Sequence, residues 1–277
     1  MRFRTILSVA VMALLAWAVL PWNVLRAQKP FKEWPAIEYE DFPIPPGADR
    51  PSEWTRARLR YPDITGYPNG RFLGFAGYWT MDYPRSDRHL LEGVRRLTRI
   101  DARPLEQVVS LDGGDDIYNW PTMYGVEVGH WDLPQGQADQ LREYLLRGGF
   151  LMVDDFHANA EWRIFEESLK RIFPEKDWVD LPNTDPIFHT VYDLDDRVQI
   201  PGMGSVERGV TYEKDESGRP AHWRAVYDSK GRVIVAICHN MDMGDAWEHS
   251  DNPVYPEKMA SLAYRIAMNY FIYDFTH

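Results

Sequence analysis

The chain has 277 residues, with 42 acidic and 31 basic side chains and a formal net charge of −11 at pH 7. Such an acidic chain repels nucleic acid and anionic lipid surfaces, so we expect no nucleic-acid partner. Cys238 is the only cysteine, which excludes an internal disulfide and leaves the burial of apolar side chains to stabilise the fold.

The first 27 residues have the pattern of an export signal. Two arginines precede an uncharged, mostly apolar run from Ile6 to Leu20, and a cleavage site follows at Ala27. The run is shorter than the roughly 20 residues of a membrane-spanning helix, which favours a cleaved signal over a retained anchor. We therefore expect export to the periplasm or another cell-envelope compartment, with membrane contact only through an uncleaved leader. The segment contains three arginines and no acids, so its removal changes the net charge from −11 to −14.

Residues 28 to 53 are rich in proline and acidic side chains and show neither strand nor helix periodicity. We interpret them as a linker or a wrapping arm. Residues 54 to 277 are long enough for a single α/β domain. Its first predicted strand, residues 55 to 61, alternates Arg56, Arg58 and Arg60 with apolar residues, which places the arginines on one face.

The rest of the domain alternates between helix and strand patterns. We expect helices at 86–100, 135–147 and 257–273, and strands at 107–111, 123–128, 150–153 and 232–237. Continuous apolar strands are typical of parallel sheets covered on both faces. The alternation therefore predicts a doubly wound, mostly parallel sheet with helices on both faces. Residues 194 to 231 are polar and rich in turn residues, and we expect a small β-hairpin insertion there.

Polar side chains gather where the predicted strands end. In open α/β sheets, ligands bind outside the carboxyl ends of the strands, where the loops converge. The candidate ligand-binding residues at these positions are Asp112, Asp154, Asp155, His157, His239, Asn240, Asp242, Asp245 and Trp247, and His130 lies at a comparable position.

Carboxylates and imidazoles brought together in this way can hold a divalent metal, and they can also serve as general acid and base. The candidate metal ligands are Asp154, His157, His239 and Asp245, and the candidate catalytic residues are Asp155, His157 and His239. A purely structural alternative stands beside this hypothesis. In it, Asp154 caps the next helix, Asp155 binds loop amides, and Asp242 and Asp245 order a tight turn around Gly244.

The commonest catalytic motifs are absent from the sequence. It has no Gly-x-Ser-x-Gly, Walker A, Gly-x-Gly-x-x-Gly or His-Glu-x-x-His pattern. Cys238 follows a predicted strand, but Ile237 and His239 flank it where a nucleophile elbow needs small residues, so we expect a buried structural thiol. Trp79, Trp120 and Trp247 lie near polar loop residues, which keeps a sugar or peptidoglycan ligand under consideration.

Several spaced motifs resemble one bacterial family. They include residues 57–61, Trp79 followed by residues 82–84, residues 148–150 and 154–156, and residues 238–240 followed by Gly244-Asp245. Together they resemble the family called domain of unknown function 4159. The resemblance implies a flavodoxin-like fold similar to the class I glutamine amidotransferase-like superfamily, with no established activity. The amidotransferase Gly-x-Cys-x-Gly elbow and His-x-Glu pair are missing, so we do not expect amidotransferase activity.

Two functional hypotheses follow from these observations. The first is an envelope module that binds a small ligand or a protein partner at the strand ends, supported by the missing nucleophile. The second is a metal-assisted hydrolase of envelope glycan or peptide, supported by the density of titratable groups at two strand ends. Relatives of this family occur beside von Willebrand-type envelope proteins, which by association makes an envelope protein complex a candidate partner.

Overall fold

The computed structural model describes residues 29–35, 42–48, 50–64 and 77–277. The predicted export signal and part of the predicted arm lie outside these residues. Residues 31–277 form one compact unit. Among the described residues, no helix combines the length and apolar character needed to cross a membrane.

The core of the fold is a seven-stranded sheet with the strand order β2-β1-β3-β4-β7-β6-β5. Its strands are β1 (Ala57–Arg60), β2 (Gln107–Ser110), β3 (Thr122–Val126), β4 (Phe150–Asp154), β5 (Val179–Asp180), β6 (His222–Tyr227) and β7 (Val233–His239). All neighbouring pairs from β2 to β7 are parallel, whereas β6 runs antiparallel to both β7 and β5. The carboxyl ends of five parallel strands therefore meet at one edge.

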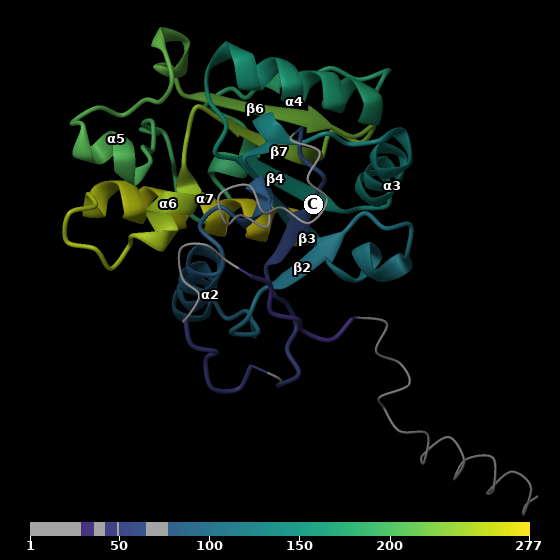
Figure 1. The fold of residues 1–277 in the computed structure, drawn as a ribbon, viewed down its shortest axis with the longest axis horizontal. Helices are drawn as coiled ribbons and strands as arrows, with labels where there is room; N and C mark the ends of the chain where they lie inside the picture. The colour runs from purple at the N-terminus through teal and green to yellow at the C-terminus, as the bar shows by residue number, and fades with distance from the viewer. Residues whose placement is uncertain (1–28, 36–41, 49, 65–76) are drawn as a thin grey trace, which may run out of the picture. The chain divides into compact units, whose positions relative to one another are not determined.

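Helices cover both faces of the sheet (Figure 1). They are α2 (Arg85–Leu97), α3 (Gln135–Leu146), α4 (Ala158–Ile172), α5 (Met203–Glu207), α6 (Met243–Glu248) and α7 (Glu257–Thr276). Buried side chains of α3 and α4 form a core with one face, and those of α2, α6 and α7 form a core with the other. The predicted doubly wound α/β architecture is confirmed, and it is consistent with a flavodoxin-like fold.

Local signals predicted most boundaries within a few residues. Gly148 ends α3 with a φ of 114°, a conformation that glycine adopts at low cost. The helix predicted at 86–100 begins one residue earlier, so Ser86 lies inside α2, where it is fully buried. The β-hairpin insertion predicted within residues 194–231 is not found, because these residues contain α5 and β6 and form no hairpin of their own. β6 pairs with β7 and β5 within the main sheet, and its Trp223 and Val226 each contribute to a core.

The arginine face of β1 is partly buried. Arg58 is fully buried and forms an ion pair with Asp87, in which Nε donates to Oδ2 at 2.8 Å and Nη2 lies 2.7 Å from the same oxygen. Its Nη1 donates to the backbone carbonyls of Trp79 and Met81, at 3.0 and 2.9 Å. Arg58 therefore fixes the loop that leads into Asp82, which is part of the site described below.

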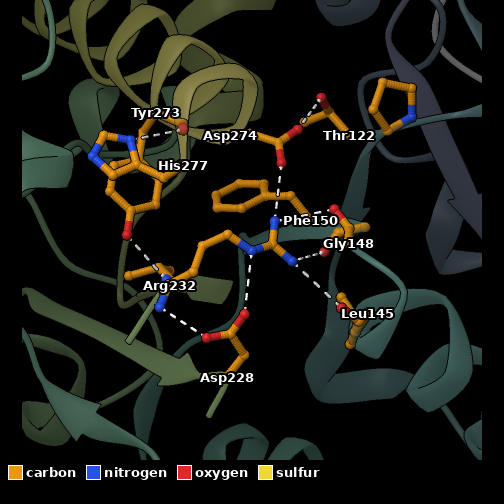
Figure 2. A network of polar contacts seen from close by, with 12 residues as sticks. Thr122, Leu145, Gly148, Phe150, Asp228, Arg232, Tyr273, Asp274 and His277 are labelled. Atoms are coloured by element: carbon orange, nitrogen blue, oxygen red, sulfur yellow. Dashed lines mark hydrogen bonds and ion pairs between the residues drawn. The ribbon is translucent and has the colours of Figure 1, made fainter. Parts of the chain in front are cut away.

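A second arginine, Arg232, connects α7 to the opposite edge of the sheet, where the parallel strands begin (Figure 2). Arg232 lies between Asp228 and Asp274, with 3.5 Å between each pair of charged atoms, and it donates to the carbonyl of Gly148 at 3.0 Å. Thr122, the first residue of β3, donates to the other oxygen of Asp274 at 2.9 Å. Burial raises the pKa of Asp274 to about 7. This network ties α7 to the strand starts.

Candidate functional site

The carboxyl ends of β4 and β7 lie side by side, because the two strands pair in parallel. The chain segments that follow them are joined directly. The backbone amide of Asp155, the residue after β4, donates to the carbonyl of Met241 at 2.9 Å. The residues that follow the two strands are therefore brought together, as the sequence predicts.

Five aspartates form what we call the carboxylate cluster: Asp82, Asp154, Asp155, Asp242 and Asp245. One carboxylate oxygen from each of Asp82, Asp242 and Asp245 lies within 4.8 Å of the others. Asp155 contributes electrostatically, since its charge, together with those of Asp245, Asp82 and Asp154, raises the pKa of Asp242 beyond the effect of burial. Hard carboxylate oxygens at this spacing suit a cation such as Mg²⁺ or Ca²⁺.

Asp154 is the most completely buried member of the cluster. Its Oδ2 accepts hydrogen bonds from the backbone amides of Met243 and Gly244, at 2.8 and 3.1 Å, and from the Tyr124 hydroxyl at 3.2 Å. Its Oδ1 is also buried and has no hydrogen-bond partner in the described structure. Burial raises the pKa of Asp154 to about 7. The structural alternative holds in part. Asp154 binds the first amides of α6 rather than those of the next helix in the chain, and Asp242 is the N-cap of α6, because its Oδ1 accepts from the Asp245 amide at 2.8 Å.

Asp155 and His157 form a buried pair. His157 Nε2 lies 3.1 Å from Asp155 Oδ1, and Nδ1 of the same ring has no hydrogen-bond partner in the part of the chain that is described. Burial raises the pKa of Asp155 well above its ordinary value, and the charges of Glu127 and Asp82 raise it further. Burial lowers the pKa of His157 to about 3, so its imidazole is neutral at physiological pH.

Two glycines are required by the crowding around the cluster. A Cβ at Gly244 would lie 2.0 Å from Asp82 Oδ2, and a Cβ at Gly202 would lie 2.5 Å from Asp242 Oδ2 and 2.6 Å from Glu213 Oε1. Contacts this short would force the carboxylates to move. The carboxylates therefore pack directly against the backbone at Gly202 and Gly244.

A second titratable group adjoins the cluster at the end of β3. His130 Nδ1 lies 2.9 Å from Glu127 Oε2, and Lys214 Nζ lies 3.2 Å from Glu161 Oε1. Burial by itself would lower the pKa of His130, but the hydrogen bond and charge of Glu127 raise it. The ring of Tyr78 stacks on that of His130, with centroids 3.9 Å apart. Because Lys214 and His130 pair with the acids, this group is more nearly neutral than the carboxylate cluster.

Backbone strain is concentrated at the same edge of the sheet. Six non-glycine residues among those described have a positive φ, and all lie in or beside the two groups: Asp82, Glu127, Asp155, Ala158, Lys214 and Asn240. Each such conformation costs on the order of 1–3 kcal/mol and persists only when its surroundings impose it. Strained backbone conformations are often found at functional sites. They therefore indicate a functional site at this edge of the sheet independently of the clustered charges.

Several predicted site residues lie outside the cluster. His239 Nε2 donates to the carbonyl of Ala158 at 3.2 Å, and its Nδ1 lies 3.3 Å from Nη1 of Arg224. Burial lowers the pKa of His239 to about 3. Asn240 joins Ala158 to the carbonyls of Ser217 and Pro220, at 2.8, 3.0 and 2.8 Å. Both side chains have their hydrogen bonds satisfied by the fold.

Trp247 and Asp112 are also separate from the cluster. Trp247 is fully buried, and the guanidinium of Arg56 lies 4.6 Å from its ring, so it belongs to the core. Asp112 lines a different pocket, at the end of β2. The cluster therefore contains four of the predicted residues (Asp154, Asp155, Asp242 and Asp245), and His157 pairs with one of them.

The sequence interpretation missed Asp82, Glu127, Glu161, Glu213 and Lys214 as site residues. One signal was available for Glu127, which follows the last residue of β3 directly, just as Asp155 follows β4. Asp82 and Glu213 carry no such signal, because each lies in a loop away from a strand end.

The family comparison gives one result. A sequence model of the family described as a domain of unknown function (DUF4159) matches residues 57–275. No curated protein matches the chain. The match begins at the first residue of β1 and ends in α7, so it covers the whole sheet and every member of the carboxylate cluster.

Proposed function

The chain belongs to the family of domain of unknown function 4159, and we propose that in this member the carboxylate cluster binds a divalent cation and, through it, a small ligand or a protein partner. The observation that carries the proposal is the approach of carboxylate oxygens from Asp82, Asp242 and Asp245 to within 4.8 Å of one another. Oxygen ligands of this kind are the ones that hard divalent cations prefer.

A second observation supports a ligand at this place. Asp154 Oδ1 is buried and lacks a hydrogen-bond partner in the described structure, although its companion oxygen accepts three hydrogen bonds. A buried carboxylate oxygen without a partner is costly. A cation beside Asp242 would interact favourably with this oxygen, because the charge of Asp154 already raises the pKa of Asp242.

Titration of the chelator-treated full chain with Mg²⁺, Ca²⁺, Mn²⁺ and Zn²⁺ tests the proposal by calorimetry. We expect one ion to bind with a stoichiometry near one, and Asp242→Asn and Asp245→Asn to weaken binding about tenfold or more. Asp177→Asn is the matched control, because Asp177 is exposed and lies outside the cluster. The proposal fails if none of the four ions binds, or if Asp242→Asn binds as tightly as the natural chain.

A metal-assisted hydrolase is the second candidate, because a carboxylate orients the neutral imidazole of His157 at 3.1 Å. A general base is held in this way in several hydrolases. The lowered pKa of about 3 makes this imidazole a weak base at neutral pH, which ranks the hydrolase second. Assays on envelope glycan and peptide substrates with His157→Asn as the comparison test it, and turnover that this variant retains would exclude the role.

The prediction of a buried structural thiol is confirmed. Cys238 is fully buried, and burial raises the pKa of its thiol well above the ordinary value, which disfavours the nucleophilic thiolate. The relation to the glutamine amidotransferase-like superfamily stays a prediction.

Export to the cell envelope and membership of an envelope complex are also part of this proposal. The basic and apolar pattern of residues 1–27 supports export, and the association of relatives with von Willebrand-type envelope proteins supports the complex. Fractionation of cells that produce the tagged chain, with N-terminal sequencing of the product, tests export. A cytoplasmic product with an intact N-terminus would contradict it.

A further inference from the structure

A pocket of about 270 Å³ lies at the carboxyl ends of β1 and β2. No member of the carboxylate cluster lines it. Its polar lining comes from Arg60, Asp63, Ser110, Asp112 and Gln137. Its apolar lining comes from Pro62 and Leu111 and from the edges of Tyr61 and Trp79, which are otherwise buried. This volume is near the lower limit of about 300 Å³ for small-molecule pockets, which suits a single ring of a ligand.

Arg60 is held in place by aromatic rings rather than by an acid. Its guanidinium lies 4.5 Å from the centre of the Trp34 ring and 6.0 Å from that of Trp79. Within the described ranges, Arg60 forms no ion pair. Stacking orients the guanidinium while its N–H groups stay available as donors, which is a common arrangement for arginine in binding sites.

The mixed charge of the lining decides the class of ligand. A simple anion would meet Asp63 and Asp112, and a simple cation would meet Arg60. For either ion, electrostatic repulsion on one side of the pocket would offset the attraction on the other side. A neutral ligand rich in hydroxyl groups avoids both penalties, because each hydroxyl donates to a carboxylate and accepts from a guanidinium or an amide.

We propose that this pocket binds one ring of a neutral saccharide. The sugar hydroxyls donate to Asp63 and Asp112 and accept from Arg60 and from the Gln137 amide. The C–H groups of the ring contact the apolar part of the lining. This site goes beyond the proposed cation site, since the two share no residue.

Calorimetry and tryptophan fluorescence on the full chain test the proposal. The probes are oligosaccharides of N-acetylglucosamine, glucose and mannose, together with sodium phosphate and sodium acetate as anions. We expect at least one oligosaccharide to bind, and Arg60→Met and Asp112→Asn each to weaken its binding about tenfold, as the loss of hydrogen bonds to charged groups implies. Gln135→Ala is the matched control, because Gln135 is exposed, lies in α3 like Gln137 and does not line the pocket.

Asp112→Asn is a conservative substitution, so that a loss of sugar binding can be distinguished from a loss of folding. Asp112 is exposed, and an asparagine keeps the oxygen that accepts from the Gly114 amide at 3.0 Å. The melting temperature of the variant checks that the fold is retained. Absence of binding by all three sugar series, binding that Asp112→Asn leaves unchanged, or binding of phosphate or acetate in their place would overturn the proposal.

To distinguish this pocket from the cation site, the sugar titrations are repeated in EDTA and with the Asp242→Asn variant. Sugar binding that is unchanged under both conditions is the expected result. Sugar binding that is lost under both would place the sugar on the cation and overturn the separate pocket.

Discussion

The Asp154 carboxylate accepts a 3.1 Å hydrogen bond from the backbone amide of Gly244, which lies 90 residues further along the chain. The bond joins the end of β4 to the start of α6, across the boundary between β4 and β7. Gly244 has no Cβ, and a Cβ there would lie 2.0 Å from Asp82 Oδ2. One contact therefore couples the strand end, the short helix and the loop that carries Asp82.

Asp154→Ala should destabilise the domain more than Asp154→Asn. Alanine leaves the buried amides of Met243 and Gly244 without an acceptor, at a cost of about 1–3 kcal/mol each. Asparagine keeps an acceptor oxygen and removes the buried charge. Urea unfolding at pH 8 in EDTA measures both variants. Equal stability of the two would contradict the capping role of Asp154.

The stability of the chelated chain should fall as the pH rises from 6 to 8. The pKa values of Asp154 and Asp274 are about 7 in the folded chain, against an ordinary value of 3.8. In this window both carboxyl groups hold more protons in the folded chain than in the unfolded chain, so the free energy of unfolding decreases with rising pH. The opposite contribution of His157 and His239, whose pKa values are lowered from 6.5 to about 3, is largest below pH 6. Asp274→Asn and Asp154→Asn should each reduce the slope in thermal melts. A slope of the opposite sign would refute this assignment.

A divalent cation should restore the stability that is lost at high pH. The cation binds the ionised carboxylates of the cluster, so it stabilises the folded chain most where protons have left. Asp274→Asn should keep this cation effect, because Asp274 lies at the opposite edge of the sheet, whereas Asp242→Asn should lose it. Melts at pH 8 with and without the ion make the comparison. An equal effect on both variants would place the cation elsewhere.

Gly202→Ala should weaken cation binding about tenfold or more, by analogy with changes to groups that orient metal ligands. The new Cβ would lie 2.5 Å from Asp242 Oδ2 and would push the carboxylate out of position. Gly136→Ala is the matched control. A Cβ at Gly136, within α3, meets nothing within 4 Å, so alanine there should raise stability by up to about 1 kcal/mol without changing cation binding. Calorimetric titration gives both affinities.

His239→Ala should lower stability without changing cation affinity. The substitution removes a hydrogen-bond partner from the Ala158 carbonyl and from Arg224, although Arg224 keeps its ion pair with Asp180. It also opens a gap beside Phe156, whose ring centre lies 5.0 Å from that of His239. We expect a loss of about 2–4 kcal/mol from the cavity and the broken hydrogen bonds. Denaturant unfolding and calorimetry measure the two properties. A tenfold loss of cation affinity in a folded variant would make His239 a metal ligand after all.

Much of the fold and part of the candidate site could be predicted from the sequence alone. The helix and strand patterns, the glycine that ends α3 and the aspartates that follow β4 and β7 are local features, because periodicity and capping depend on neighbours in the chain. The parallel order of the strands then places their ends at one edge. The fold class, the family and four cluster aspartates were accessible in this way.

Only the tertiary structure decided which polar side chains belong together. His239 ends β7 on the face that packs against Phe156 and Trp162, because side chains alternate along a strand, whereas Asp242 lies beyond the positive φ of Asn240 and joins the cluster. Asp82 reaches the cluster through a loop that Arg58 holds. Such contacts join residues distant in the chain, and their partners depend on packing that no local pattern encodes.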